Sequence, residues 1–328
     1  MKKKVLVVLL TVLTFGALQA QKVNYAVISV PEEAGLGFKK VTKTNDYVCM
    51  PQVVRRSGKV DWFSNRVLAI SPDNDSTIAY LSWRNETSNI FIKDLTRQGS
   101  STQRTNRNSV LDFSYSPDGK YICFAEQRGK TTQIFQTDAK SGYVCRQVTS
   151  GDNDYSPVYS QDMSEIFFAR SESMGASIWS YNVANNLLSS ISLGMNPCLI
   201  PGQSELVCAR SSNDGRYELW KINMKTGREE CLVSDPTRSF TSPQVSPDGK
   251  WIVFVGDSRL AAGSSVYVNV DIFACRIDGT DFAQLTYHAA DDLSPVWSLD
   301  GRHIYFVSQR GDVNGTANIW RMDFLLNR

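Results

Sequence analysis

The sequence predicts an all-β protein, a six-bladed β-propeller built from four-stranded antiparallel blades. One tight turn recurs along the chain, strand-like runs flank its copies, and neighbouring copies begin 40 to 52 residues apart. Repeats of this length are typical of propellers. The six copies of the turn begin at Ser71, Ser116, Ser160, Ile200, Ser246 and Ser298.

The turn has the pattern Ser-Pro-Asp-Gly at residues 116–119 and 246–249, with weaker versions in the other units. Proline presets φ at the second turn position, aspartate accepts a hydrogen bond from a nearby backbone N–H, and glycine supplies a positive φ. The pattern therefore predicts a tight hairpin with a fixed register in each unit.

Each unit also carries strand signals in the same order. A proline stands three residues before four of the turns, and a run such as Ile122-Cys123-Phe124 follows five of them. A third run places an aliphatic beside an aromatic residue in all six units, and a shorter fourth run, such as residues 146–149, closes some units. A four-stranded meander cannot bury both of its faces alone, so we expect the units to stack around an axis. An open solenoid is the structural alternative.

The last unit stops after its third strand, near residue 323. Residues 37–42 read like the fourth strands of other units and lie before the first unit. We therefore expect an N-terminal strand to close the ring in the last blade. Residues 47–65 form either an extra hairpin or the fourth and first strands of this closure.

The first twenty residues have the pattern of a secretory signal peptide, with Lys2 to Lys4, an apolar stretch and Ala20 at the expected cut. The expected organisation is a signal peptide at 1–20, an N-terminal extension at 21–37 and the propeller at 38–328. The apolar stretch is too short for a comfortable transmembrane anchor. No cysteine lies near the cut to carry a lipid, so we expect a periplasmic or secreted protein.

Charge and cysteine content narrow the function. The chain has 35 basic and 33 acidic residues, and this balance gives no sign of nucleic-acid binding. Seven cysteines leave at least one thiol unpaired in an exported chain. Most of them lie in apolar strand-like runs and are expected to be small buried residues. Cys198 and Cys208 are the one pair that the repeat places close enough to test for a disulfide.

A cation recurs at the end of the second strands, where the loops of a propeller gather on one face. A ring of guanidiniums there would hold carboxylates or an acidic peptide. The alternative is that each arginine pairs with an acid of a neighbouring blade, with Asp112, Asp154 and Asp292 as the obvious partners. The series consists of Arg84, Arg128, Arg170, Arg210, Arg259 and Arg310.

The loop at residues 287–292 is the strongest candidate for a functional loop, because His288 lies close in sequence to Asp291 and Asp292. An ordinary polar surface loop is the alternative. The chain has two histidines and no Gly-x-Ser-x-Gly motif. We therefore expect no catalytic residues, no metal and no cofactor. A carbohydrate-active or other small-substrate enzyme that uses loop carboxylates at the channel mouth is the alternative, and glycan binding without turnover is a third hypothesis.

Residues 295–302, Pro-Val-Trp-Ser-Leu-Asp-Gly-Arg, and residues 246–250 resemble the propeller repeats of the TolB family. The resemblance covers residues 38–328, without the separate α/β domain of TolB. It implies a protein partner in the cell envelope, such as a peptidoglycan-associated lipoprotein docked at one mouth of the propeller. We therefore predict an exported, non-catalytic scaffold, expected as a monomer, that recognises a protein or peptide over its loop face and channel mouth.

Overall fold

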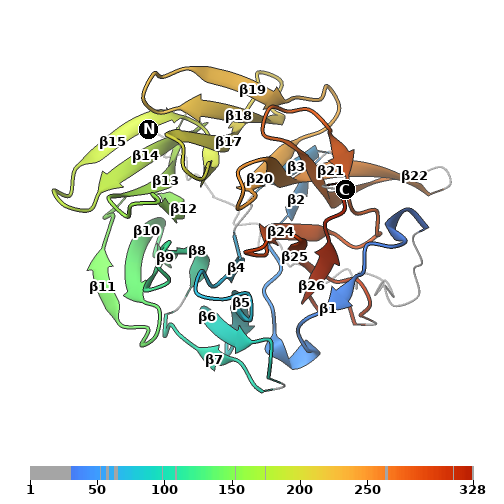
Figure 1. The fold of residues 1–328 in the computed structure, drawn as a ribbon, viewed down its shortest axis with the longest axis horizontal. Helices are drawn as coiled ribbons and strands as arrows, with labels where there is room; N and C mark the ends of the chain where they lie inside the picture. Colours follow the sequence, from blue (N-terminus) through green and yellow to red (C-terminus); the bar gives the residue numbers. More distant parts are fainter. Residues whose placement is uncertain are drawn as a thin grey trace, which may run out of the picture.

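Six four-stranded antiparallel sheets surround a central axis in the computed structural model of this chain (Figure 1). The structure describes residues 31–326 except 52, 57–58, 63–65, 98, 108, 152, 174, 263–264 and 313. The predicted six-bladed propeller is confirmed. The expected signal peptide and residues 21–30 lie outside the described residues.

The first strand of each blade lies nearest the axis and the fourth lies outermost (Figure 1). The strands of blades 1 to 3 are β4 (Leu68–Ile70), β5 (Thr77–Arg84), β6 (Thr87–Asp94), β7 (Thr102–Gln103), β8 (Val110–Tyr115), β9 (Tyr121–Arg128), β10 (Thr131–Asp138), β11 (Val144–Gln147), β12 (Asp154–Tyr159), β13 (Glu165–Glu172), β14 (Gly175–Asn182) and β15 (Leu188–Leu193). The hydrophobic core lies between blades: Ile134 of blade 2 and Phe168 of blade 3, for example, belong to one buried cluster.

Blades 4 to 6 repeat this pattern, with a longer central hairpin in blade 5. Their strands are β16 (Met195–Leu199), β17 (Glu205–Ser211), β18 (Tyr217–Asn223), β19 (Glu229–Val233), β20 (Phe240–Val245), β21 (Trp251–Ala262), β22 (Ser265–Arg276), β23 (Ala283–Gln284), β24 (Asp292–Trp297), β25 (His303–Ser308) and β26 (Asn318–Asp323). β2 (Val53–Arg56) and β3 (Lys59–Trp62) form a separate two-stranded sheet. The extra hairpin is therefore the correct one of the two alternatives for this stretch.

The ring is closed by β1 (Lys39–Lys40), which pairs with β26 as the fourth strand of blade 6. The backbone N–H of Val41 donates to the carbonyl of Ile319 at 2.8 Å. Gly37 has a φ of +59°, and a Cβ there would lie 2.5 Å from the Asp323 carboxylate. The positive φ and this close approach favour glycine at position 37, and the predicted closing strand is confirmed.

The recurrent turn is held by its serine as well as its aspartate. In blade 2 the Ser116 hydroxyl donates to Asp118 at 2.7 Å and accepts the N–H of Tyr121 at 2.9 Å. Asp118 also accepts the N–H of Lys120 at 3.1 Å, and Gly119 has a φ of +69°. The serine thus fixes the first pair of the hairpin, which explains why it recurs in five of the six units.

Four inner strands contain a bulge just before their proline. The residue at the bulge has a positive φ of 52° to 55° and is a serine or asparagine: Ser156, Asn196, Ser242 and Ser294. The strand pairing shifts register at each of these points. Hydrogen bonds at this level connect neighbouring blades, since Val67 N–H donates to Ser294 Oγ at 3.0 Å and Ser156 N–H donates to Asp112 Oδ2 at 2.8 Å. The same level therefore joins blade 6 to blade 1 and blade 2 to blade 3.

The disulfide considered between Cys198 and Cys208 is not formed, and both thiols are free. Cys198 lies opposite Val207, because the bulge in β16 shifts the pairing register. Side chains of adjacent residues point to opposite faces of a strand, so Cys208 faces away from Cys198. Burial raises the pKa of the Cys208 thiol to about 12.

Candidate binding sites on the loop face

The loop face is the side of the propeller that carries the turns between second and third strands and the connections between blades. The arginine series lies at this end of the second strands. Four of the guanidiniums stack on an aromatic ring of the third strand of their own blade. The pairs are Arg84 with Phe91 at 4.1 Å, Arg128 with Phe135 at 5.1 Å, Arg170 with Trp179 at 4.6 Å, and Arg210 with Trp220 at 4.5 Å.

Arg310 of blade 6 stacks instead on Phe38, next to the closing strand, at 4.3 Å. The side chain of Arg259 lies outside the described residues. The structure therefore places five predicted cations at the loop-face ends of their second strands, each resting on a ring. Arg84, Arg128 and Arg310 share one repeat position, and Arg170 and Arg210 lie two residues earlier in theirs.

Four of these five arginines are paired with carboxylates inside the protein. Arg170 makes two hydrogen bonds to the buried Asp154, at 2.7 and 3.2 Å. The other pairs are Arg128 with Glu126 at 2.9 Å, Arg210 with Glu229 at 2.8 Å, and Arg310 with both Asp292 and Glu33. These four arginines are thus paired inside the protein, but their acids belong to the same blade or, for Glu33, to the N-terminal segment, and not to a neighbouring blade as the bracing alternative required. Asp112, the third predicted acid, contacts Ser156 and none of the series in the described structure.

Arg84 is the exception. Its partners are neutral: the Ser82 hydroxyl at 3.0 Å and the Asp46 carbonyl at 3.2 Å. Among the described residues no carboxylate pairs with it. The Tyr47 ring, which is 54% exposed, lies 5.5 Å from the guanidinium. Trp83, which is 55% exposed, precedes Arg84 in β5. We call Tyr47, Trp83 and Arg84 the aromatic patch.

The aromatic patch is held in place by Asp46, which precedes Tyr47 in the short helix η3 (Thr44–Asp46). The Asp46 carboxylate is buried and contacts Lys93 Nζ at 3.1 Å, Ser101 Oγ at 2.7 Å and the N–H of Lys43 at 2.9 Å. Burial alone raises the pKa of Asp46, but these hydrogen bonds and the Lys93 charge outweigh it and lower the pKa. Trp83 N–H donates to the Tyr47 carbonyl at 3.0 Å, which fixes the two aromatic residues side by side.

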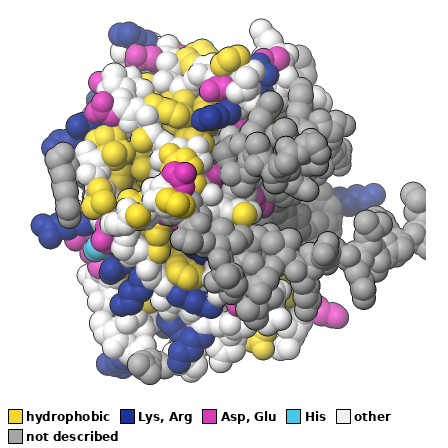
Figure 2. All heavy atoms as spheres, turned by 90° about the vertical axis from the view of Figure 1, so that its right-hand side faces the viewer, with side chains coloured by type: hydrophobic (Ala, Val, Ile, Leu, Met, Phe, Trp, Pro, Cys, Tyr) yellow, Lys and Arg dark blue, Asp and Glu magenta, His cyan; other side chains and the backbone are white. Residues whose placement is uncertain are grey.

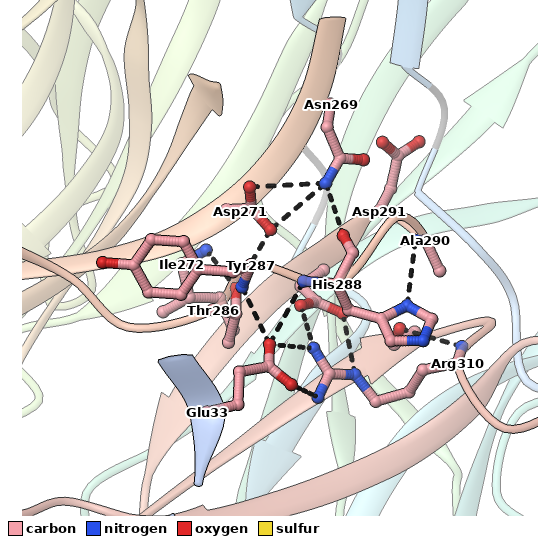
Figure 3. A network of polar contacts seen from close by, with 12 residues as sticks. Glu33, Asn269, Asp271, Ile272, Thr286, Tyr287, His288, Ala290, Asp291 and Arg310 are labelled. Atoms are coloured by element: carbon pink, nitrogen blue, oxygen red, sulfur yellow. Dashed lines mark hydrogen bonds and ion pairs between the residues drawn. The ribbon is translucent and has the colours of Figure 1, made fainter. Parts of the chain in front are cut away.

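A second cluster lies at the loop-face end of blade 6, and Figure 3 shows it. Glu33, from the short helix η2 (Pro31–Glu33), pairs with Arg310 at 3.0 and 3.1 Å. Arg310 Nε also donates to Asp292 at 3.3 Å. All three side chains are buried. Burial raises the pKa of Asp292 to about 6 despite the neighbouring Arg310.

His288 belongs to this cluster and is buried, at 4% exposure. The expectation of an ordinary surface loop is therefore wrong for this residue. Its Nδ1 accepts the N–H of Ala290 at 3.0 Å, and its carbonyl accepts a hydrogen bond from Asn269 at 2.6 Å (Figure 3). Asp291 accepts the N–H of Val270 at 3.1 Å. These polar groups thus fasten the loop to β22.

The structure brings Arg310, Asp292, Asp291 and His288 together, and it places Arg84, Arg128, Arg170 and Arg210 on separate blades. The repeat did not indicate Glu33, Tyr47 or Trp83. Glu33 and Tyr47 precede the first unit, where no repeat exists to compare. Trp83 could have been noticed from the sequence, because the equivalent residue of blade 2 is the polar Gln127, which is exposed. A large aromatic residue at such a position indicates an exposed ring.

Within the described part of the chain no three His, Cys, Asp or Glu side chains are grouped so that they could hold a metal ion. No helix of the described residues is long and apolar enough to cross a membrane. Figure 2 shows the outer side of blades 5 and 6, where basic and acidic side chains are interspersed over the coloured surface. The coloured surface in this view therefore carries no large patch of a single charge sign.

The fold and the loop face define a six-bladed propeller with most of its loop-face arginines in internal ion pairs. The family model of the TolB β-propeller domain matches residues 63–260, more than half of the chain. The chain therefore belongs to the TolB β-propeller family, as its repeats indicated.

Relatives and solved structures agree on the fold. The Tol-Pal system protein TolB of Francisella tularensis subsp. holarctica is 27% identical over 169 residues, which are 50% of this chain and 39% of that protein. The chain thus spans about two fifths of the length of the curated TolB relatives it matches. The crystal structure of TolB from Acinetobacter baumannii has a TM-score of 0.59 at 18% identity, and covers 76% of this chain and 64% of that one. The oligogalacturonate lyase of Vibrio parahaemolyticus also has a TM-score of 0.59, at 10% identity, over 88% of this chain and 94% of that one.

Proposed function

We propose that this protein is a non-catalytic binding module of the bacterial envelope, exported to the periplasm, that recognises a protein partner over the loop face. The contact is centred on the aromatic patch of Tyr47, Trp83 and Arg84. The observation that carries the proposal is that Arg84 has no carboxylate partner among the described residues, while the half-exposed Tyr47 ring lies 5.5 Å from its guanidinium and the half-exposed Trp83 is the preceding residue of the strand.

The composition of the patch suits a protein contact. Tryptophan, tyrosine and arginine are the side chains that most often carry binding energy in protein interfaces. Arg84 is held by Ser82, the Asp46 carbonyl and the Phe91 ring, so little side-chain freedom is lost when a partner binds. An acidic side chain of the partner supplies the counter-charge that Arg84 lacks. The name of the TolB relatives, Tol-Pal system protein, makes another component of a Tol-Pal type system the first candidate partner.

The enzyme alternative needs two carboxylates free to act on a substrate at the channel mouth. Two carboxylates that meet at one side chain, Glu33 and Asp292, both pair with Arg310 and are buried. This arrangement supports binding over catalysis, and the lyase neighbours share the fold at only 10 to 13% identity.

The proposal is tested by quantitative affinity capture from envelope extract with the immobilised mature protein. A Trp83→Ala, Arg84→Gln variant is compared with Tyr143→Ala, which removes an aromatic ring of 74% exposure on blade 2, away from the patch. We expect the double variant to recover at least about tenfold less of one protein than the wild type does, since two side chains of types that often carry binding energy are removed. Equal recovery of every protein by all three baits would refute the proposed surface.

A further inference from the structure

The Glu33 carboxylate at the loop-face end of blade 6 accepts four hydrogen bonds (Figure 3). Two come from the Arg310 guanidinium, at 3.0 and 3.1 Å. The other two come from consecutive backbone N–H groups, that of Tyr287 at 2.8 Å and that of His288 at 3.2 Å, and both reach Oε1. An arginine that binds both oxygens, beside two N–H groups aimed at one of them, is an arrangement that recognises a carboxylate.

The donors of this site are held by contacts other than those to Glu33. Arg310 Nε donates to Asp292 at 3.3 Å, and the guanidinium stacks on the Phe38 ring at 4.3 Å. The carbonyl of His288 accepts a hydrogen bond from Asn269 at 2.6 Å, which holds the loop against β22. The donors therefore keep their places when the carboxylate leaves, so the site is built in advance of its occupant.

The segment that carries Glu33 is held by this one side chain. Among residues 31–35 Glu33 is buried and the other four are exposed. The hydrogen bonds that join residues 31–35 to the rest of the described chain all end on the Glu33 carboxylate. The N–H groups of Ala34 and Leu36 donate within the segment. The tie to blade 6 begins at Leu36, whose carbonyl accepts the N–H of Asp323 at 2.8 Å. Release of Glu33 therefore frees residues 31–35 without opening the ring.

We propose that this is a binding site for an acidic side chain of a partner peptide, and that Glu33 closes it in cis. Residues 31–35 act as an autoinhibitory strap, and a partner that presents a carboxylate competes with Glu33 for Arg310. The present occupant is a glutamate on an otherwise exposed stretch of main chain, which is the form in which a peptide offers a carboxylate. The site lies on blade 6 and the aromatic patch on blade 1, so the inference does not rest on the proposed function.

The first test supplies the strap in trans. Fluorescence anisotropy measures the binding of a labelled hexapeptide with the sequence of residues 31–36, Pro-Glu-Glu-Ala-Gly-Leu, to the full mature protein. The proteins compared are the wild type, Glu33→Ala, and the matched control Glu32→Ala, which removes the neighbouring exposed carboxylate. A second peptide, with Glu33→Gln, keeps the shape of the side chain and removes its charge.

We expect Glu33→Ala to bind the acidic peptide at least about tenfold more tightly than the wild type and Glu32→Ala do, because the site of the latter two is already occupied. The Glu33→Gln peptide should bind Glu33→Ala at least about tenfold more weakly than the acidic peptide. Absence of binding to Glu33→Ala, or equal affinities of the three proteins, overturns the proposal.

A second measurement uses the wild type alone, so it decides the matter even if Glu33→Ala fails to fold. Amide hydrogen exchange is compared between the N–H groups of Tyr287 and His288, which donate to Glu33, and that of Ile272, which donates to Thr286 Oγ1 at 2.9 Å. We expect the first two to exchange at least about tenfold faster than the third, because opening of the strap alone exposes them. Exchange of all three at one rate would show that the strap does not open by itself, and would overturn the proposal.

Discussion

The same repeat position carries Arg310 in blade 6 and Arg84 in blade 1, yet the two guanidiniums stand in opposite electrostatic surroundings. Arg310 is buried between two carboxylates, Glu33 and Asp292. Arg84 has only neutral partners in the described structure and lies 5.5 Å from the exposed Tyr47 ring. The stacking on an aromatic ring is common to both sites.

The difference comes from the N-terminal segment, which contributes to both sites before the repeats begin. At blade 6 this segment supplies the Glu33 carboxylate, which forms an ion pair with Arg310. At blade 1 it supplies the Asp46 carbonyl and the Tyr47 ring, while the Asp46 carboxylate is used by Lys93 and Ser101. The N-terminal segment thus neutralises Arg310 of blade 6 and leaves Arg84 of blade 1 able to pair with a carboxylate of another molecule. This comparison predicts different costs for equivalent substitutions.

The largest effect is expected for Arg310→Ala. The substitution leaves Glu33 and Asp292 buried together without their cation, which costs about 3 to 5 kcal/mol of unfolding free energy. Urea denaturation of the purified mature chain measures it. Arg128→Ala is the matched variant, because Arg128 holds the equivalent position but is about half exposed, and it should cost less than about 1 kcal/mol. Similar costs for the two variants would contradict the contrast between buried and exposed pairs.

A smaller effect is expected for Asp112→Asn. Burial raises the pKa of Asp112 to about 6, so between about pH 4 and 6 the folded state holds a proton that the unfolded state has lost. Stability from this group therefore increases as pH falls through that window, and at pH 7 the charged carboxylate is a constant penalty. We expect Asp112→Asn to be about 1 kcal/mol more stable at pH 7. Its unfolding free energy should depend less on pH between 4 and 6, and an unchanged pH profile would contradict the raised pKa.

The smallest effect on stability is expected for Arg84→Gln. This guanidinium makes no ion pair in the described structure, so we expect a change below about 1 kcal/mol, measured by the same urea titration. Loss of partner binding without loss of stability would sharpen the comparison with Arg310. A destabilisation as large as that of Arg310→Ala would show that Arg84 is a structural residue.

The repeat predicted the fold because the turn chemistry is local. The serine, aspartate and glycine of residues 116–119 act within six residues of one another, and the same pattern recurs in other blades. The closing strand was predictable for the same reason, since residues 37–42 resemble the other fourth strands.

The sites were less predictable because they depend on contacts between distant segments. Glu33 meets Arg310 across 277 positions of the chain, and nothing in the repeat marks it. His288 looked exposed in sequence, but Asn269 and Ala290 draw its loop into the protein. The bulge in β16 shifts the strand register by one residue, which separates Cys198 from Cys208 and is not visible in the sequence pattern.

The most direct test of the central claim is site-specific photo-crosslinking in cells, with a photoreactive amino acid in place of Trp83. We predict an ultraviolet-dependent adduct to one envelope protein, weakened by Arg84→Gln and absent when the photoreactive group replaces Tyr143, which is more exposed than Trp83. No adduct from position 83, or the same adduct at equal yield from position 143, would contradict a binding surface at the aromatic patch.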